Sequence, residues 1–174
     1  DDFDLVVEAA APALARAAVE AWGGQLVVHA PFATATWTAP DGVAFDLASA
    51  RTEHYPRPAA LPVVQAPVSL AEDLRRRDFT INAMSATQGG ALYDPFEGQK
   101  DLAAGRIRFI GAARDRIRED VLRLLRFYRF YAHYGRGEMD AEAVAAVREL
   151  APLLPSLSGE RVAAEFLRLL AAAD

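Results

Sequence analysis

The chain has 174 residues, with 19 Lys and Arg against 24 Asp and Glu, and a formal net charge of −5. It contains no cysteine and three scattered histidines, which excludes a disulfide scaffold and disfavours a zinc site, so any metal is expected to have oxygen ligands. No stretch reaches the roughly 18 apolar residues of a membrane span. The sequence therefore predicts a soluble, cytoplasmic protein of one or two small domains, without a membrane partner or a stable protein partner.

The charge is unevenly distributed along the chain. Residues 1–74 carry a net −7, residues 75–136 carry +6, and residues 137–174 carry −4. Of the 19 basic residues, 18 are Arg, whose planar guanidinium suits phosphates and the edges of bases. A basic middle between two acidic flanks predicts a localised site for an anion.

The first part of the chain predicts a small sheet with one helix. A short β-rich run at 3–7 precedes an Ala-rich helix at 9–22, which Gly23-Gly24 ends. Three further strands are expected at 25–29, 33–38 and 43–48. A Pro-Asp-Gly turn joins the last two strands as a hairpin, so the sheet is expected to be mixed and mostly antiparallel. The four prolines of residues 55–68 predict a mobile or extended loop.

The second part of the chain predicts mainly helices. A capped helical turn at 69–77 leads into a short apolar segment, and two strand-like pieces follow at 84–93 and 106–110. Helices are expected at 112–134, 140–150 and 158–173. The fold class is therefore α+β, with one domain at residues 1–111 and a helical domain at residues 112–174.

Acidic residues on the first strand suggest a metal site. Asp2 and Asp4 flank Phe3, and the two-residue period of a strand places both carboxylates on one face. Mg²⁺ would relieve their repulsion, and Asp46 on a neighbouring strand could complete the set of carboxylates used in two-metal nucleotidyl transfer. For a D-x-D pattern alone, a solvated acidic terminus is the favoured interpretation.

Two Arg-rich motifs support the interpretation of the acidic residues as a nucleotidyl-transfer site. In RRRDFTINAM, at 75–84, Arg77 offers a cation for phosphate, and Asp78 and Asn82 offer groups that can bond a ribose hydroxyl. In REDVLRLLRFYRF, at 118–130, arginines alternate with apolar residues all round a helix, which predicts partners for them within the protein or in a ligand. The alternative for this second motif is a set of internal ion pairs with residues such as Glu119 and Glu160.

Asp120 and Arg123 are three residues apart, so both could reach one ligand. Asp accepts a hydrogen bond from an exocyclic amino group, and Arg donates to ring acceptors. Cytosine and adenine present an amino group beside a ring acceptor, whereas uracil and guanine present a carbonyl there. The pair therefore predicts binding of CTP and ATP and rejection of UTP and GTP.

With these residues identified, the chain resembles the class II, bacterial and eukaryotic type of tRNA nucleotidyltransferase. This class comprises the CCA-adding enzymes, their CC- or A-adding relatives and the bacterial poly(A) polymerases. The resemblance rests on six motifs in order: DxD at 2–4, FDLASARTEHY at 45–55, RRRDFTINAM, YDPFEGQKDL at 93–102, REDVLRLLRFYRF, and LSGERVAAEFLRLL at 157–170. It implies a catalytic head of the DNA polymerase β type followed by a helical neck.

The resemblance also implies roles for particular residues. Asp2 and Asp4 would hold two Mg²⁺ ions, with Asp46 as the third carboxylate. Five residues would contact the incoming nucleotide, namely Arg77, Asp120, Arg123, Arg126 and Arg129. Asp120 and Arg123 would act as a template for the base, and LSGER would orient them. The family's Gly-Gly-x-x-Arg element before the D-x-D strand and its C-terminal body and tail are not among the 174 residues.

The leading hypothesis is a Mg²⁺-dependent, template-independent nucleotidyltransferase that adds CMP and/or AMP, from CTP or ATP, to the 3′ end of tRNA and releases pyrophosphate. One alternative is a poly(A) polymerase of the same superfamily, which would extend RNA ends with A only. An alternative of another class is a non-catalytic nucleotide- or RNA-binding module that keeps the arginines without the transfer chemistry. A Gly-Gly-x-x-Arg element upstream of Asp1 would favour the enzyme.

Overall fold

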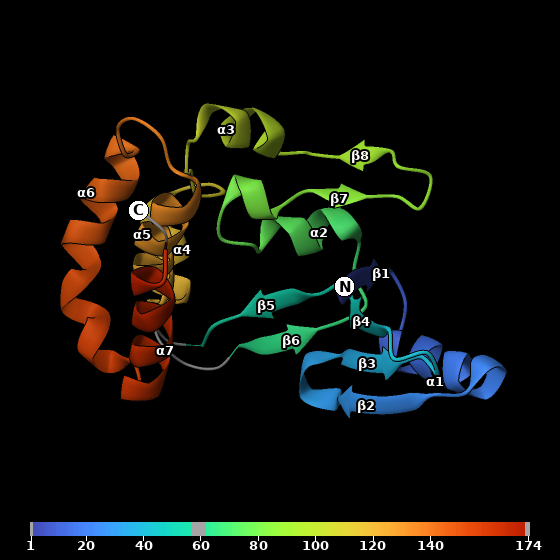
Figure 1. Cartoon of the computed structure of the whole chain (residues 1–174). Coiled ribbons are helices and arrows are strands. Elements are labelled where there is room, and N and C mark those ends of the chain that lie inside the picture. The colour runs from blue at the N-terminus through green and yellow to red at the C-terminus, as the bar shows by residue number, and fades with distance from the viewer. Residues whose placement is uncertain (1, 57–61, 173–174) are drawn as a thin grey trace. The chain divides into compact units, whose positions relative to one another are not determined.

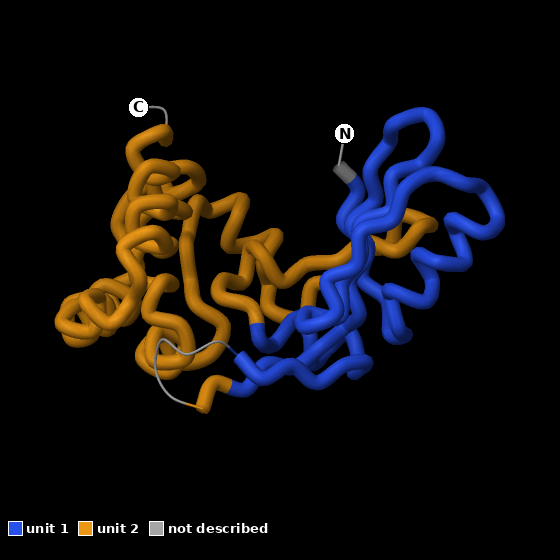
Figure 2. Tube along the Cα trace, turned by 90° about the horizontal axis from the view of Figure 1, so that it is seen from below, with its two compact units in different colours: residues 1–54, 62–76 blue, residues 55–61, 77–174 orange. Residues whose placement is uncertain are grey.

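The computed structural model describes residues 2–56 and 62–172 (Figure 1). The chain forms two compact units, shown in different colours in Figure 2. Unit 1 comprises Asp1–His54 and Pro62–Arg76, and unit 2 comprises Tyr55–Leu61 and Arg77–Asp174. Residues 77–111 thus belong to the same compact unit as the C-terminal helices, and the predicted functional division at residue 111 stays a prediction.

Unit 1 is built on a four-stranded sheet with the strand order β1-β4-β3-β2. The strands are β1 (Asp2–Val7), β2 (Gln25–His29), β3 (Thr34–Thr38) and β4 (Ala44–Ser49). Strand β1 is parallel to β4, and the other two pairs are antiparallel. The predicted mixed, mostly antiparallel sheet is therefore confirmed, as is the α+β class.

Helix α1 (Ala11–Trp22) covers one face of this sheet. Its buried Ala11 and Ala15 pack against Ala35 and Leu47, because alanines allow a close approach of the helix to the strands. Further along the same face, aromatic rings stack across three strands, with centroids 5.2 Å apart for Phe3 and Phe45 and 5.1 Å apart for Phe45 and Trp37. The residues that alternate with these point to the opposite face, and they include Asp4 of β1 and Asp46 of β4.

The segment after the sheet departs from the predicted loop at 55–68. Strand β5 (Thr52–His54) pairs with β6 (Val63–Gln65) in an antiparallel hairpin, so part of the Pro-rich segment is a strand. Sequence periodicity could not indicate a strand of three residues whose pairing partners lie 9 to 13 residues away in the sequence. Residues 57–61 of the predicted loop lie outside the described residues. Helix α2 (Leu70–Arg75) follows and begins with the predicted cap, a capping box of Ser69 and Glu72.

The long segment of unit 2 contains first a 3-10 turn, η2 (Thr80–Asn82), and then a small ladder of β7 (Ser85–Ala86) and β8 (Leu92–Tyr93). Its helices are α3 (Gly98–Ala104), α4 (Ala113–Glu119), α5 (Arg123–Tyr134), α6 (Ala141–Leu150) and α7 (Gly159–Leu170), with a 3-10 segment at Ala151–Ser156. The predicted strand at 106–110 is present only as an isolated bridge between Phe79 and Phe109. Ser158 caps α7 by accepting from the Arg161 N–H.

The predicted helix at 112–134 is two helices, because Asp120 breaks it. Asp120 has extended backbone angles, with φ −137° and ψ 106°, and ends α4. Its carboxylate accepts a hydrogen bond from the Leu122 N–H at 3.2 Å, a local bond that competes with the helical one. Helix α5 then begins at Arg123, so the chain turns where the sequence pattern continued without interruption.

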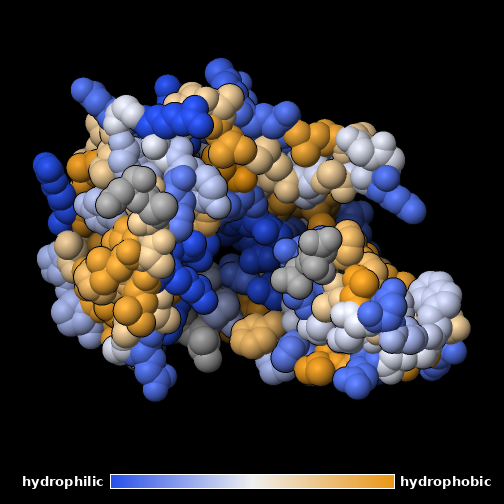
Figure 3. Space-filling view, viewed as in Figure 1, coloured by the Kyte–Doolittle hydropathy of each residue, from blue (hydrophilic) through white to orange (hydrophobic). Residues whose placement is uncertain are grey.

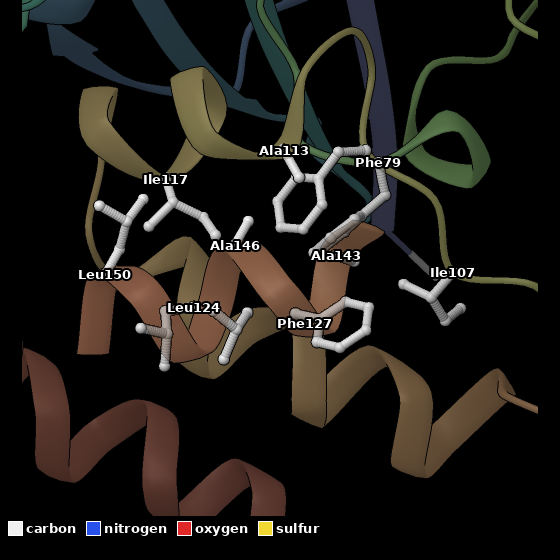
Figure 4. Close-up of a cluster of buried hydrophobic side chains, with 11 residues drawn as sticks. Phe79, Ile107, Ala113, Ile117, Leu124, Phe127, Ala143, Ala146 and Leu150 are labelled. Carbon is white, nitrogen blue, oxygen red and sulfur yellow. The ribbon is translucent and has the colours of Figure 1, made fainter. Parts of the chain in front are cut away.

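The core of unit 2 joins the segment around Phe79 to the helices (Figure 4). Phe79 and Phe127 are fully buried and Phe109 nearly so, and the Phe79 and Phe109 ring centroids lie 4.8 Å apart. Ile117 of α4 and Ala146 of α6 pack in the same cluster. The RRRDFTINAM motif is therefore fixed to α5 by apolar packing, which places its polar residues beside the arginines of that helix.

Helix α7 has an apolar outer stripe. Phe166, Leu167 and Leu170 are 48%, 66% and 65% exposed, and apolar atoms gather over this helix in Figure 3.

No helix within the described residues has the length and hydrophobicity that crossing a membrane requires.

Candidate active site

Two of the predicted metal-binding carboxylates lie side by side on the sheet of unit 1. Asp4 of β1 is in register with Asp46 of the parallel strand β4, and both side chains are exposed on the face that α1 does not cover. The Thr36 hydroxyl of β3 donates to Asp46 Oδ1 at 2.5 Å, which orients this carboxylate. Asp2 begins β1, and its side chain lies outside the described part of the chain.

These residues suit a hard divalent cation. The donors on this face are carboxylate oxygens, the ligands that Mg²⁺ prefers, and their exposure leaves room for water and substrate oxygens. No group of three His, Asp or Glu side chains placed for a metal occurs among the described side chains, which do not include that of Asp2. The structure thus brings together two of the three predicted carboxylates, Asp4 and Asp46.

In unit 2, Asp78 binds two other residues of the predicted nucleotide site, Asn82 and Arg126. It is 6% exposed and accepts hydrogen bonds from the Phe79 N–H at 2.9 Å, from Asn82 Nδ2 at 3.0 Å and from Arg126 Nε at 2.6 Å. Burial raises the pKa of Asp78, but the charge of Arg126 and these hydrogen bonds outweigh burial and hold the pKa below its ordinary value. Asp78 is therefore an anion that fixes Asn82 and Arg126 in place, with both oxygens occupied by protein.

Each arginine of α5 has a carboxylate partner on a different element. Arg126 pairs with Asp78 as described, and Arg123, 6% exposed, pairs with Glu119 of α4 at 2.7 Å and donates to the Arg116 carbonyl at 3.0 Å. Arg129 pairs with Glu165 of α7, which is 2% exposed. The alternative of internal ion pairs is therefore right for Glu119, whereas Glu165 is the partner in place of Glu160.

Arg161 of α7 binds the carboxylate of Asp120. Arg161 Nη2 lies 3.0 Å from Asp120 Oδ1 and 3.1 Å from Oδ2. Asp120 and Arg123 are also adjacent, since the Arg123 N–H donates to the Asp120 carbonyl at 3.0 Å. The prediction that both lie on one helix is wrong for Asp120, which precedes α5, and this difference lets Arg161 approach its carboxylate. Arg77 is half-buried and is the first residue of the long segment of unit 2.

Arg161 belongs to the LSGER motif, to which the resemblance gives the role of orienting Asp120 and Arg123, whereas Glu165 and Asp101 were not identified from the sequence. Glu165 follows Arg161 by one helical turn on α7, so the two face α5 together, a spacing that could have revealed Glu165. Asp101 of α3, 3% exposed, accepts from the Thr80 hydroxyl at 2.6 Å and from Arg108 Nε at 2.9 Å. This buried bond ties the Asp78–Asn82 turn to α3, a helix that the sequence pattern did not predict.

The mixed sheet of unit 1, with carboxylates on adjacent strands, and the helices of unit 2 form an α+β fold of the DNA polymerase β-type head class. A family model described as the poly A polymerase head domain matches residues 1–108, and the chain belongs to this family. A second family model, described as the probable RNA and SrmB-binding site of polymerase A, matches residues 138–174.

Relatives of known activity agree with this family. The A-adding tRNA nucleotidyltransferase of Halalkalibacterium halodurans is 39% identical over 176 residues, which cover 97% of this chain and 40% of the relative. A solved apo CCA-adding enzyme superposes with a TM-score of 0.87 at 33% identity, over 99% of this chain and 41% of its own. The Bacillus stearothermophilus CCA-adding enzyme in complex with CTP superposes with a TM-score of 0.80 at 31% identity, over 98% and 40%. The chain thus spans about two fifths of the length of these relatives.

Proposed function

We propose that this chain carries the nucleotidyl-transfer and nucleotide-selection sites of an enzyme that adds CMP and/or AMP, from CTP or ATP, to the 3′ end of tRNA. The observation that carries the proposal is the register of Asp4 with Asp46 on the open face of the sheet. Adjacent exposed carboxylates of this kind are suited to two-metal displacement at phosphorus. The A-adding and CCA-adding activities of the relatives give the substrate class.

Asp4 and Asp46, together with Asp2, would hold Mg²⁺, and the oxygen-only donor set fits this ion. When bound there, Mg²⁺ supplies Lewis-acid stabilisation of the attacking 3′-oxygen and of the leaving pyrophosphate. The protein's part is to fix the carboxylates on two hydrogen-bonded strands, with the Thr36 hydroxyl directing Asp46. The residues of the chain thus position the reactants and form no covalent bond with the substrate.

The arginines would bind and align the triphosphate. Arg77 follows Arg76, the C-cap of α2, and Arg126 and Arg129 lie on consecutive turns of α5. The carboxylate partners of Arg126 and Arg129 hold these two guanidinium groups in fixed orientations, which lowers the entropy lost when an anion binds. Asn82, held by Asp78, would bond a ribose hydroxyl.

Asp120 and Arg123 would select the base. Each carboxylate oxygen has two lone pairs, so Asp120 can accept from an exocyclic amino group while it remains bound to Arg161. A carbonyl of uracil or guanine at that position would face the Asp120 carboxylate, which is also an acceptor, so the carbonyl would lose its hydrogen bond to water without gaining a donor. Discrimination by such unpaired polar groups reaches about 10⁴-fold or more in enzymes built to read a hydrogen-bonding pattern.

Incorporation of labelled CMP and AMP into tRNA tests the catalytic assignment. Asp4→Asn and Asp46→Asn should each reduce incorporation by about a hundredfold or more, because each removes a charged metal ligand and leaves the shape unchanged. Asp41→Asn is the matched control, since Asp41 lies in the β3–β4 turn and caps Val43 N–H, a role that Asn also fills. Activity near that of the wild type in Asp46→Asn would contradict the proposal.

A further inference from the structure

An ionic cluster in unit 1 shares no residue with the carboxylates of the sheet. It consists of Arg51, Glu53, Asp73 and Arg76, which come from the segment after β4, from β5 and from α2. Two guanidinium groups share Glu53 Oε1, with Arg51 Nη2 at 3.0 Å and Arg76 Nη1 at 2.8 Å. The cluster balances two positive against two negative charges, which allows it to be buried.

Arg76 makes the largest number of these bonds. Its Nε donates to the Arg51 carbonyl at 2.9 Å and to Asp73 Oδ1 at 3.1 Å, and its Nη2 donates to Asp73 Oδ1 at 2.7 Å. The side chains of Asp73 and Glu53 are 1% and 8% exposed, and that of Arg76 is 20% exposed. The guanidinium of Arg76 therefore binds acceptors of unit 1, although Arg76 stands in a run of three consecutive arginines.

The cluster lies where the chain leaves unit 1. Arg76 caps α2 and is the last residue of unit 1, and Arg77 is the first residue of the long segment of unit 2. Earlier in the chain, Glu53 is followed by His54, after which the chain leaves unit 1 for the first time. The ion pair between Arg76 and Glu53 thus joins the two stretches of chain that end at these places. It thereby fixes the end of α2, from which the chain continues to Arg77.

We propose that Arg76 is a positioning residue for nucleotide binding, which holds the end of α2 so that Arg77 meets the triphosphate in a fixed position. The inference rests on the proposed function, in which Arg77 binds phosphate. Arg76 itself does not touch the nucleotide; it acts through its neighbour. A cation that is fixed before binding loses less freedom when the ligand arrives, and its affinity is higher for that reason.

A double-mutant cycle between Arg76 and Arg77 tests this inference. The dissociation constant for CTP with Mg²⁺ is measured for the wild-type chain, Arg76→Lys, Arg77→Ala and the double variant, with thermal unfolding as the check of folding. Lys keeps the charge but loses the fork that reaches three acceptors at once. Arg76→Lys should weaken CTP about tenfold when Arg77 is present and less than about twofold in the Arg77→Ala background.

Arg75→Lys is the matched control, because it is the same change on the exposed neighbour, and it should leave CTP affinity within about twofold. If Arg76→Lys fails to fold, Glu53→Gln replaces it in the cycle, because it removes the anion that Arg76 binds. The effect of Glu53→Gln on CTP affinity should likewise depend on the presence of Arg77. Additive losses of affinity, or unchanged affinity in a folded Arg76→Lys, would overturn the inference alone. A wild-type chain that binds neither CTP nor ATP would overturn the proposed function and this inference with it.

Discussion

Replacement of Asp78 by Asn should destabilise unit 2, because Asp78 joins the turn at 78–82 to α5. The carboxylate accepts from the Phe79 N–H, from Asn82 and from two nitrogens of Arg126. The Asn carbonyl can keep the bond to the Phe79 N–H, but the charged pair is lost. Arg126 is 29% exposed and regains some hydration, so the loss of unfolding free energy should be about 2 kcal/mol, below that of a fully buried pair.

The effect should depend on pH in a defined direction. The pKa of Asp78 is lower in the folded chain than its ordinary value of 3.8, so its stabilising contribution is fully present above that ordinary value. The contribution is lost as the pH falls through the folded pKa, where the carboxylate takes up a proton. The difference between wild type and Asp78→Asn should therefore be constant from about pH 7 to about pH 5 and shrink in stronger acid.

Urea unfolding followed by far-UV circular dichroism measures this difference. Asp115→Asn is the matched control, since the Asp115 side chain is 70% exposed and its pair with Arg118 spans 4.0 Å; it should change the unfolding free energy by under about 0.5 kcal/mol. A difference for Asp78→Asn no larger than that of the control, or one that grows as the pH falls, would refute the reasoning.

Two further changes test the packing. Glu165→Gln should lower the unfolding free energy by about 2 to 3 kcal/mol because it leaves the buried charge of Arg129 without its anion; the same change at the exposed Glu160 should be nearly neutral, and equal effects would contradict the assignment. Gly24→Ala should cost at least about 2 kcal/mol, since its Cβ would lie 2.2 Å from a backbone oxygen at φ +96°. Gly42→Ala, with open space at φ +88°, should cost only about 1 kcal/mol, and equal unfolding midpoints for the two variants would argue against the close approach at Gly24.

The sequence predicts the sheet well because its strands alternate and its turns are marked by Gly and Pro. The register that places Asp4 beside Asp46 follows from a parallel pairing that no local pattern contains. The same holds for β6, whose three residues form a strand only because β5 lies beside them. Long-range pairing, which depends on the whole fold, is what the local pattern lacks.

The arginines of α5 were predicted as a group from their alternation with apolar residues, but their partners were only partly predicted. Glu119 is close in sequence and was identified, whereas Glu165 lies 36 residues from Arg129 and depends on how α7 packs. The break at Asp120 was missed because the apolar period continues through it. Its cause is a side-chain bond to Leu122 N–H and a distant ion pair with Arg161, neither of which alters the sequence pattern.

The most direct test of the proposed function is to offer labelled CTP, ATP, UTP and GTP separately, with Mg²⁺, to a tRNA that lacks its 3′-terminal nucleotides and to a generic RNA. The account predicts that C, A or both are added to the tRNA in a limited number, and that U and G are not. Long A tails on both RNAs would indicate a poly(A) polymerase instead. No incorporation into either RNA, or equal incorporation of all four nucleotides, would contradict the assignment of Asp4 and Asp46 to transfer and of Asp120 and Arg123 to base selection.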